Sequence, residues 1–436
     1  MQLELASQRL TSHARVEARR MSSTVAQAPA AWAEACYYAY ILYGLMSPAW
    51  GISVPMVSAG GLALLAAMCW LSLGSTTLVV TRALTAPVLC ASTFVAVQIF
   101  FHGESVLGDS IRPWVTWILA LVVVQSLALR RGFIHRFAGF AFCLVLIVLP
   151  YLQFSMTGLG IAQAGLDRRI TIGNSNNFAA WVGFCCLYFA VLGLQTKYQA
   201  IRTVSWICGA VCALIVGLTV SRGTLLALVT GLVTACRRVL KRGFFPVLAL
   251  CVALWIAIEL GIFDGAIQSY TVRGTVETGR LLVWPLALQR VFDSPLIGYG
   301  VSDTGTYVPQ GGAYITTHNS LLYLLVAAGI VPALFYIVYL SQAFWRTLFP
   351  GRHPELVEDQ PFRLPLLVYL LLITQSTDNA FMAAWAIATL TLATSAVPSR
   401  PARRFEETSR ARPSARGGLI STQLAGLASP THLPLK

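Results

Sequence analysis

The sequence has few charged residues and long hydrophobic runs. Only 11% of its residues are charged and 56% are hydrophobic, with a mean hydropathy of +0.69. An ordinary soluble domain carries about 25% charged residues, so a water-exposed surface cannot be built from this composition. Lipid offers no partner to an unpaired backbone group, and helices are therefore the expected spanning element. The sequence predicts an all-α, polytopic membrane protein.

The sequence also lacks the patterns expected of a cleavable signal peptide, of disulfide bonds, of a metal site and of a nucleotide-binding loop. Residues 1–30 are polar and rich in arginine, so we expect no cleavable signal and the first helix acts as the insertion signal. The ten cysteines fall in or beside apolar runs, which predicts packing or lipid-facing roles rather than disulfides. The predicted outside loops lack the ligand spacing of a metal site, and the chain lacks a Walker A motif. We therefore expect a protein without a metal or other cofactor that does not use ATP directly.

Apolar runs long enough to cross a hydrocarbon core of about 30 Å recur along the chain. They predict about 12 spans in a catalytic domain over residues 31–397, between an N-terminal tail at 1–30 and a disordered C-terminal tail at 398–436. The predicted spans are 31–47, 54–74, 83–101, 114–129, 136–153, 177–194, 203–220, 223–236, 244–262, 319–341, 363–376 and 381–397.

The distribution of basic residues predicts the orientation. A net charge of +14 would suggest a nucleic-acid partner in a soluble protein. Here the basic residues cluster in short loops between apolar segments, which is a topology signal, and we expect no nucleic acid. More of them fall in the inside loops when both termini are placed in the cytoplasm. This arrangement satisfies the positive-inside rule.

Two predicted outside segments are longer than a turn. One covers Ser155 to Asn176, and the other covers residues 263–318, between the ninth and tenth spans. A loop of the second length is too long for a simple connection in a compact bundle. Residues 279–292 within it have the apolar content of an interfacial helix. We therefore expect this loop to pack over the bundle and to carry function.

Polar groups lie at two span entrances. His318 ends the long loop, and imidazole is the side chain best able to exchange a proton near neutral pH. A helix N-terminus favours the neutral imidazole that a general base requires, although an interfacial or capping role fits equally well. The segment from Gly173 to Asn177 suggests hydrogen bonding to a polyhydroxylated ligand, or a helix cap.

Several arginines in the predicted outside regions point to an anionic ligand. Arg222 lies between two apolar runs, where a guanidinium needs a partner or a ligand. Carboxylates are few in these loops, and arginine binds phosphate oxygens through two hydrogen bonds at once. Arg222, Arg280 and the Arg168–Arg169 pair are therefore candidates for binding such a ligand. For the pair, a salt bridge with Asp167 is the alternative.

Four short motifs in this order resemble the O-antigen ligase and polymerase superfamily. They are Ser221-Arg222-Gly223, Gly279-Arg280-x3-Trp284-x2-Ala287, Pro295-x2-Gly298-x-Gly300 and His318-Asn319-Ser-Leu. The ligase branch of this superfamily has an Arg-x3-Leu motif, which Arg222 to Leu226 matches. It also has a His-x10-Gly motif, which His318 to Gly329 matches. The resemblance covers nearly the whole chain apart from its tails.

This resemblance implies a GT-C-like glycosyltransferase of the bacterial inner membrane with a periplasmic active site. Such ligases transfer O-antigen from undecaprenyl diphosphate, the donor, to a sugar hydroxyl of lipid A–core, the acceptor, with inversion and without a metal. It implies that His318 is the base or positions the acceptor, and that Arg222 and Arg280 stabilise the leaving diphosphate. The implied substrate-binding residues are Arg168, Arg169, Asn319, Asn177 and Trp284.

The sequence departs from the family at one point and leaves other functions open. A glutamate is frequent just before the glycine of the family's His-bearing helix, where this chain has Ala327-Ala328-Gly329. The Arg-x10-Gly pattern of well-known polymerases is absent from both outside segments, which favours a ligase over a polymerase. A protein O-oligosaccharyltransferase is a further alternative. A transporter of lipid-linked glycans is disfavoured because the predicted spans are nearly free of ionisable residues.

Overall fold

The structure is a computed structural model. It describes residues 31–47, 49–51, 55–73, 77–103, 112–128, 132–157, 160–166, 175–236, 264–265, 267–268, 279–308, 313–315, 317, 319–349 and 360–374. Contacts divide the chain into Met1–Pro398 and Ser399–Lys436, and every described residue belongs to the first unit. The predicted spans 244–262 and 381–397 lie outside the described residues.

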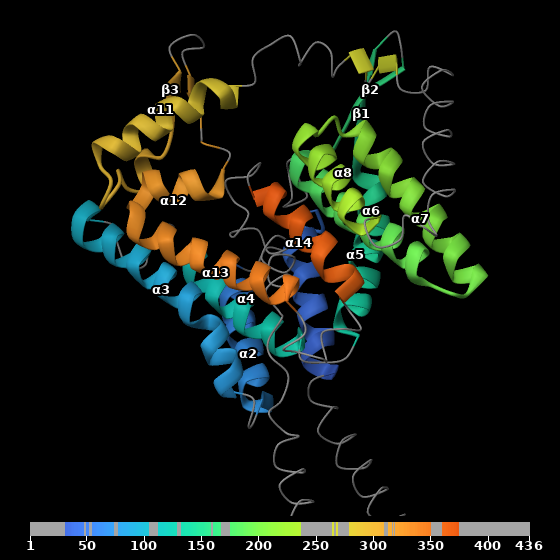
Figure 1. The fold of residues 1–436 in the computed structure, drawn as a ribbon, viewed down its shortest axis with the longest axis horizontal. Helices are drawn as coiled ribbons and strands as arrows, with labels where there is room; N and C mark the ends of the chain where they lie inside the picture. Colours follow the sequence, from blue (N-terminus) through green and yellow to red (C-terminus); the bar gives the residue numbers. More distant parts are fainter. Residues whose placement is uncertain are drawn as a thin grey trace, which may run out of the picture. The chain divides into compact units, whose positions relative to one another are not determined.

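The described part of the chain is mainly helical, as its composition predicts (Figure 1). A helix occupies each predicted span that falls in this part, and four apolar helical segments are long enough to cross a membrane. The total of about 12 spans stays a prediction. The helices are residues 31–46, α2 (Pro55–Leu73), α3 (Thr77–His102), α4 (Arg112–Ala128), α5 (Phe133–Val148), α6 (Ser175–Gln195), α7 (Gln199–Leu218), α8 (Arg222–Cys236), α11 (Gly279–Asp293), α12 (Ser320–Ala328), α13 (Ile330–Leu348) and α14 (Gln360–Thr374).

Two short antiparallel hairpins depart from the all-α prediction. Strands β1 (Leu152–Thr157) and β2 (Gly160–Leu166) pair at the start of the first predicted outside segment, so residues 152–153 of the predicted span 136–153 form strand rather than helix. Strands β3 (Thr306–Val308) and β4 (Ala313–Ile315) pair in the second. Backbone groups that leave a helix still need partners, and pairing within a hairpin supplies them locally. Both long segments therefore contain regular structure.

Glycines allow close packing among α6, α8 and α14. A Cβ added to Gly183 of α6 would lie 3.0 Å from Cγ2 of Thr224 on α8. A Cβ added to Gly231 of α8 would lie 2.7 Å from Cδ2 of Leu187 on α6. Small residues of this kind let helix backbones approach one another in membrane bundles. This packing fixes α8, the helix that begins with Arg222.

The predicted span 319–341 is two helices rather than one. Helix α12 ends at Ala328, Gly329 adopts φ 79°, and α13 begins at Ile330, so the two helices meet at an angle (Figure 1). Pro332 lies in the first turn of α13, where proline is tolerated because the first backbone amides have no partner within the helix. With nine residues, α12 is too short to cross a membrane, while α13 packs along α3. A short helix therefore lies between Asn319 and the long helix α13.

An ion pair joins the helix over residues 31–46 to α5. Arg136 donates to both carboxylate oxygens of Glu34 at 2.7 and 3.0 Å, and the Tyr38 hydroxyl donates to the same carboxylate at 2.7 Å. The Glu34 side chain is 4% exposed, whereas the Arg136 side chain is 42% exposed. The two charges therefore differ strongly in their access to water.

We expect Arg136→Met to destabilise the protein by roughly 3 kcal/mol, because it removes a paired cation from a buried carboxylate. Glu34→Gln should cost about 1 kcal/mol or less, since a half-exposed guanidinium can be hydrated instead. Thermal unfolding of the detergent-solubilised protein measures both changes. An equal loss in the two variants would contradict this asymmetry.

Candidate active site

The helix predicted in the long loop, α11, contacts Thr317 and the helix α12 that follows it. Trp284 is on α11, which packs on α12, and its indole nitrogen donates a 2.8 Å hydrogen bond to the carbonyl oxygen of Thr317. Thr317 is buried, and the residue after it is His318. This bond joins the Arg280–Trp284 motif to the neighbour of His318. Trp284 and Thr317 are 33 residues apart in sequence.

Asn319 caps helix α12 on the other side of His318. Its side-chain oxygen accepts hydrogen bonds from the backbone nitrogens of Leu321 at 3.0 Å and Leu322 at 3.1 Å. These backbone groups have no acceptor within the helix, so the cap stabilises its first turn. The structure therefore gives Asn319 a capping role, and its role in binding substrate stays a prediction.

The turn that follows α11 is held against the break between α12 and α13. The backbone nitrogen of Tyr299 donates to the carbonyl oxygen of Val326 at 2.8 Å. The backbone nitrogen of Ile330 donates to the carbonyl oxygen of Pro295, also at 2.8 Å. The turn thus pairs with the end of α12 and with the start of α13. It fixes the broken helix from one side.

Glycines make this close approach possible. Gly298 adopts φ 62°, and a Cβ added there would lie 2.5 Å from the carbonyl oxygen of Val326. Gly329 adopts φ 79°, and a Cβ added there would collide with the carbonyl group of Leu296. Only glycine tolerates both the positive φ and the contact. The Pro-x2-Gly-x-Gly motif and the glycine of the His-x10-Gly motif therefore form one packing contact.

Arg290 has a structural role that the sequence did not reveal. Its guanidinium bonds the side chain of Asp303 at 2.7 Å and lies 4.2 Å from the ring centroid of Tyr299. It also donates to the carbonyl oxygens of Asp303 and Gly305. The separation of 13 residues between Arg290 and Asp303 gives no local signal of this pairing. Arg290 therefore links α11 to the loop residues 303–305.

Arg222 begins α8 after a tight turn from α7. Val220 in that turn adopts φ 55°, a conformation that is unfavourable for a β-branched residue, and no sequence signal marked it. Leu226 lies one helical turn after Arg222 and is 63% exposed. Leu226 therefore points away from the packing of α8 on α6 and α14, whereas Arg222, one turn earlier, is half-buried. The contacts described above join α11 to α12, while Arg222 belongs to this other group of helices.

The structure places the remaining predicted residues in part. Asn177 lies in the first turn of α6 and is half-buried. Arg280 lies in the first turn of α11, where the structure describes its backbone and not its side chain. His318, Arg168 and Arg169 lie outside the described residues. Their roles remain predictions.

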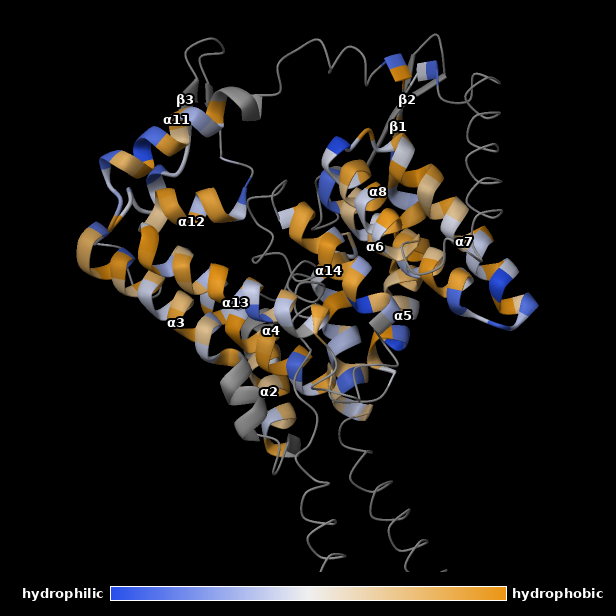
Figure 2. Ribbon diagram, in the orientation of Figure 1, coloured by the Kyte–Doolittle hydropathy of each residue, from blue (hydrophilic) through white to orange (hydrophobic). Residues whose placement is uncertain are grey.

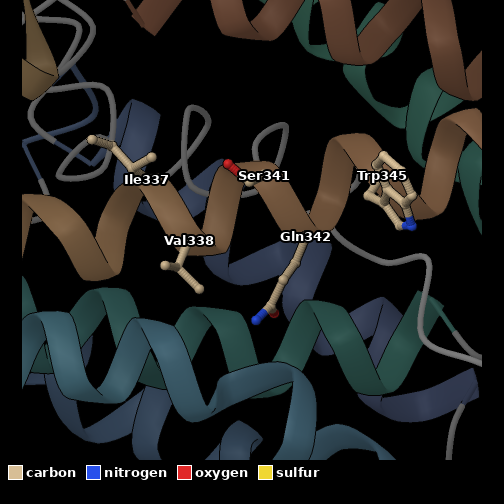
Figure 3. A pocket seen from close by; sticks show the side chains of 5 residues that line it. All are labelled: Ile337, Val338, Ser341, Gln342 and Trp345. Carbon is tan, nitrogen blue, oxygen red and sulfur yellow. The ribbon is translucent and has the colours of Figure 1, made fainter.

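A groove on α13 is distinct from this candidate site. Figure 3 shows its lining of Ile337, Val338, Ser341, Gln342 and Trp345. These side chains are uncharged, and Figure 2 shows that α13 is largely hydrophobic. The groove lining therefore offers no cation that could bind a diphosphate.

No protein-family model matches the chain, and no curated protein sequence matches it. Within the described ranges, no group of three or more histidine, cysteine, aspartate or glutamate side chains could hold a metal ion. The class that the helices define is a helical protein with several segments long and apolar enough to span a membrane.

Proposed function

We propose that the protein is an O-antigen ligase of the bacterial inner membrane. It would transfer O-antigen from undecaprenyl diphosphate to a sugar hydroxyl of lipid A–core on the periplasmic side. The observation that carries the proposal is the hydrogen bond from Trp284 to Thr317. It supports a common site because it joins the motif that contains Arg280 to the segment that contains His318.

The proposed reaction is a single displacement at the anomeric carbon of the donor glycan. The acceptor hydroxyl oxygen forms the new bond to this carbon, and the bond from the carbon to the diphosphate oxygen breaks. His318 accepts the hydroxyl proton or orients the hydroxyl group. The diphosphate leaves with the bonding electron pair, and the anomeric configuration is inverted.

Arginine side chains would stabilise the leaving group. Arg222 and Arg280 are assigned to the diphosphate because preorganised guanidinium groups stabilise charge that develops in a transition state. The activated lipid donor supplies the driving force, which agrees with the lack of a nucleotide-binding motif in the sequence. A membrane bundle is the expected scaffold because both substrates carry lipid chains.

Expression in a bacterial host that lacks its own ligase tests this function. We expect the wild-type chain to restore long glycan on lipid A–core, as seen by gel electrophoresis of lipopolysaccharide. An empty vector should leave polymerised glycan on the lipid carrier. A polymerase would instead rescue a host that adds single repeats only, and an oligosaccharyltransferase would modify protein. Either of these outcomes, without core ligation, rejects the proposal.

A further inference from the structure

Gln98 connects three segments that are distant in sequence. It lies near the C-terminal end of α3 and is fully buried. Its side-chain nitrogen donates to the carbonyl oxygen of Ala327 at 2.9 Å, at the end of α12. Its side-chain oxygen accepts from the backbone nitrogen of Val301 at 3.0 Å, at the end of the loop turn. One carboxamide therefore satisfies a donor and an acceptor on two different elements.

His102 strengthens the same contact one helical turn further along α3. Its Nε2 lies 2.9 Å from the carbonyl oxygen of Ile297. A carbonyl oxygen only accepts, so this nitrogen carries the proton. Gly300 adopts φ 85° against the imidazole, and a Cβ added there would lie 3.0 Å from its Cγ. The end of α3 is thus fitted to the turn over residues 295–301 at two successive positions.

We infer that Gln98 is a positioning residue for the proposed ligase reaction, because it fixes the loop turn and the end of α12 in one register. Helix α12 is a rigid element of nine residues. Gln98 holds its last turn, while Trp284 holds Thr317 just before its first turn. Contacts from other elements therefore fix both Thr317, just before the first turn of α12, and Ala327 in its last turn. The catalytic role of Gln98 rests on the proposed function. Its role in fixing the turn over residues 295–301 against α12 does not.

Hydrogen exchange tests the holding of the turn without any activity. We expect Gln98→Met, which keeps the size of the side chain but removes both polar groups, to accelerate amide exchange in residues 294–303 at least about tenfold. Thr93→Val is the matched control on α3, because the Thr93 hydroxyl bonds only carbonyl oxygens of its own helix. It should leave the exchange of this segment unchanged. Unchanged exchange in Gln98→Met would overturn the inference.

Gln98→Glu tests the hydrogen bonds separately from packing, because a loss of packing alone would not make amide exchange depend on pH. A protonated carboxyl group can donate to Ala327 and accept from Val301, whereas an ionised one has no proton for the Ala327 carbonyl oxygen. Protection of residues 294–303, relative to wild type at the same pH, should therefore rise in this variant as the pH falls. The same ratio should stay flat for Gln98→Met. A flat ratio as low as that of Gln98→Met would contradict the hydrogen-bonding role. A flat ratio close to one would support it, because burial then keeps the carboxyl group protonated and both bonds form at every pH.

The other titratable groups on the surrounding elements are also present in the wild type, so their own effect on exchange is divided out of this ratio, apart from any change that the new carboxylate makes to His102 one helical turn away. They are His102 on α3, Arg290 on α11, Tyr299 and Asp303 on the loop, Tyr323 on α12, and Tyr336 and Tyr339 on α13.

Kinetics then separate this inference from the proposed function. In glycan transfer by purified protein, we expect kcat of Gln98→Met to fall up to about 10²-fold while KM for the lipid donor stays unchanged, because a misplaced group slows the reaction step. If the wild type transfers no glycan but the exchange results hold, the proposed function fails and the holding of the turn stands. If the wild type is active and Gln98→Met matches it in kcat, the positioning role is wrong.

Discussion

Replacing His318 with alanine is expected to reduce glycan transfer to lipid A–core by about 10²- to 10⁴-fold, the usual contribution of a general base. The acceptor hydroxyl must lose its proton as it attacks, and alanine cannot accept it. Long glycan should then disappear from lipopolysaccharide on a gel and accumulate on the lipid carrier. Equal amounts of the variant and the wild type in the membrane are required for the comparison.

His318→Gln distinguishes a base from a positioning group. Glutamine can hydrogen-bond the acceptor but cannot take its proton near neutral pH. If His318 is the base, the glutamine variant should be as inactive as the alanine variant, and the wild-type rate should fall as the pH drops and imidazole becomes charged. Substantial activity in the glutamine variant would favour positioning. Activity near wild type in both variants would reject either role.

Replacing Arg222 or Arg280 with alanine is expected to lower kcat by about 10²- to 10³-fold, as found for the loss of one donor that stabilises transition-state charge. Lysine at either position should restore only part of the rate, because it keeps the charge but loses the paired hydrogen bonds of guanidinium. The measurement is glycan transfer by purified protein at saturating lipid donor.

Arg202→Ala is the matched control for the loss of charge. Arg202 lies near the start of α7, at the predicted cytoplasmic end, and bonds the carbonyl oxygen of Thr196 at 3.0 Å. Its removal changes the net charge equally but should leave kcat within about twofold, since it lies outside the proposed site. A comparable loss in Arg202→Ala would show that general charge, and not the site arginines, controls the rate.

Hydropathy predicted the positions of most described helices. Apolar runs such as residues 177–194 and 203–220 coincide with α6 and α7 within a few residues. This success has a simple cause, because a long apolar run in lipid can satisfy its backbone only as a helix. The same reasoning failed at residues 319–341, which remain apolar across the break. Gly329 followed by Pro332 was the available signal, since glycine commonly ends a helix and proline commonly begins one.

The candidate site was predicted as residue types and could not be predicted as contacts. The motifs with Arg280, Trp284 and His318 could be recognised in the sequence as separate short patterns. Their connection through Thr317, and the roles of Gln98 and Arg290, depend on segments that meet only after folding. A buried glutamine in an apolar helix carries no sign of its partners, because those partners are backbone groups that any residue possesses.

The sequence by itself determined that this protein is built from apolar helices and that its long loop contains a helix, since both follow from the local pattern of apolar residues. Only the tertiary structure decided that the loop turn packs on a broken helix, because that contact needs glycines at positive φ and carbonyl groups from distant segments. Local hydropathy specifies which segments form helices. The directional hydrogen bonds of the folded chain specify which of them meet.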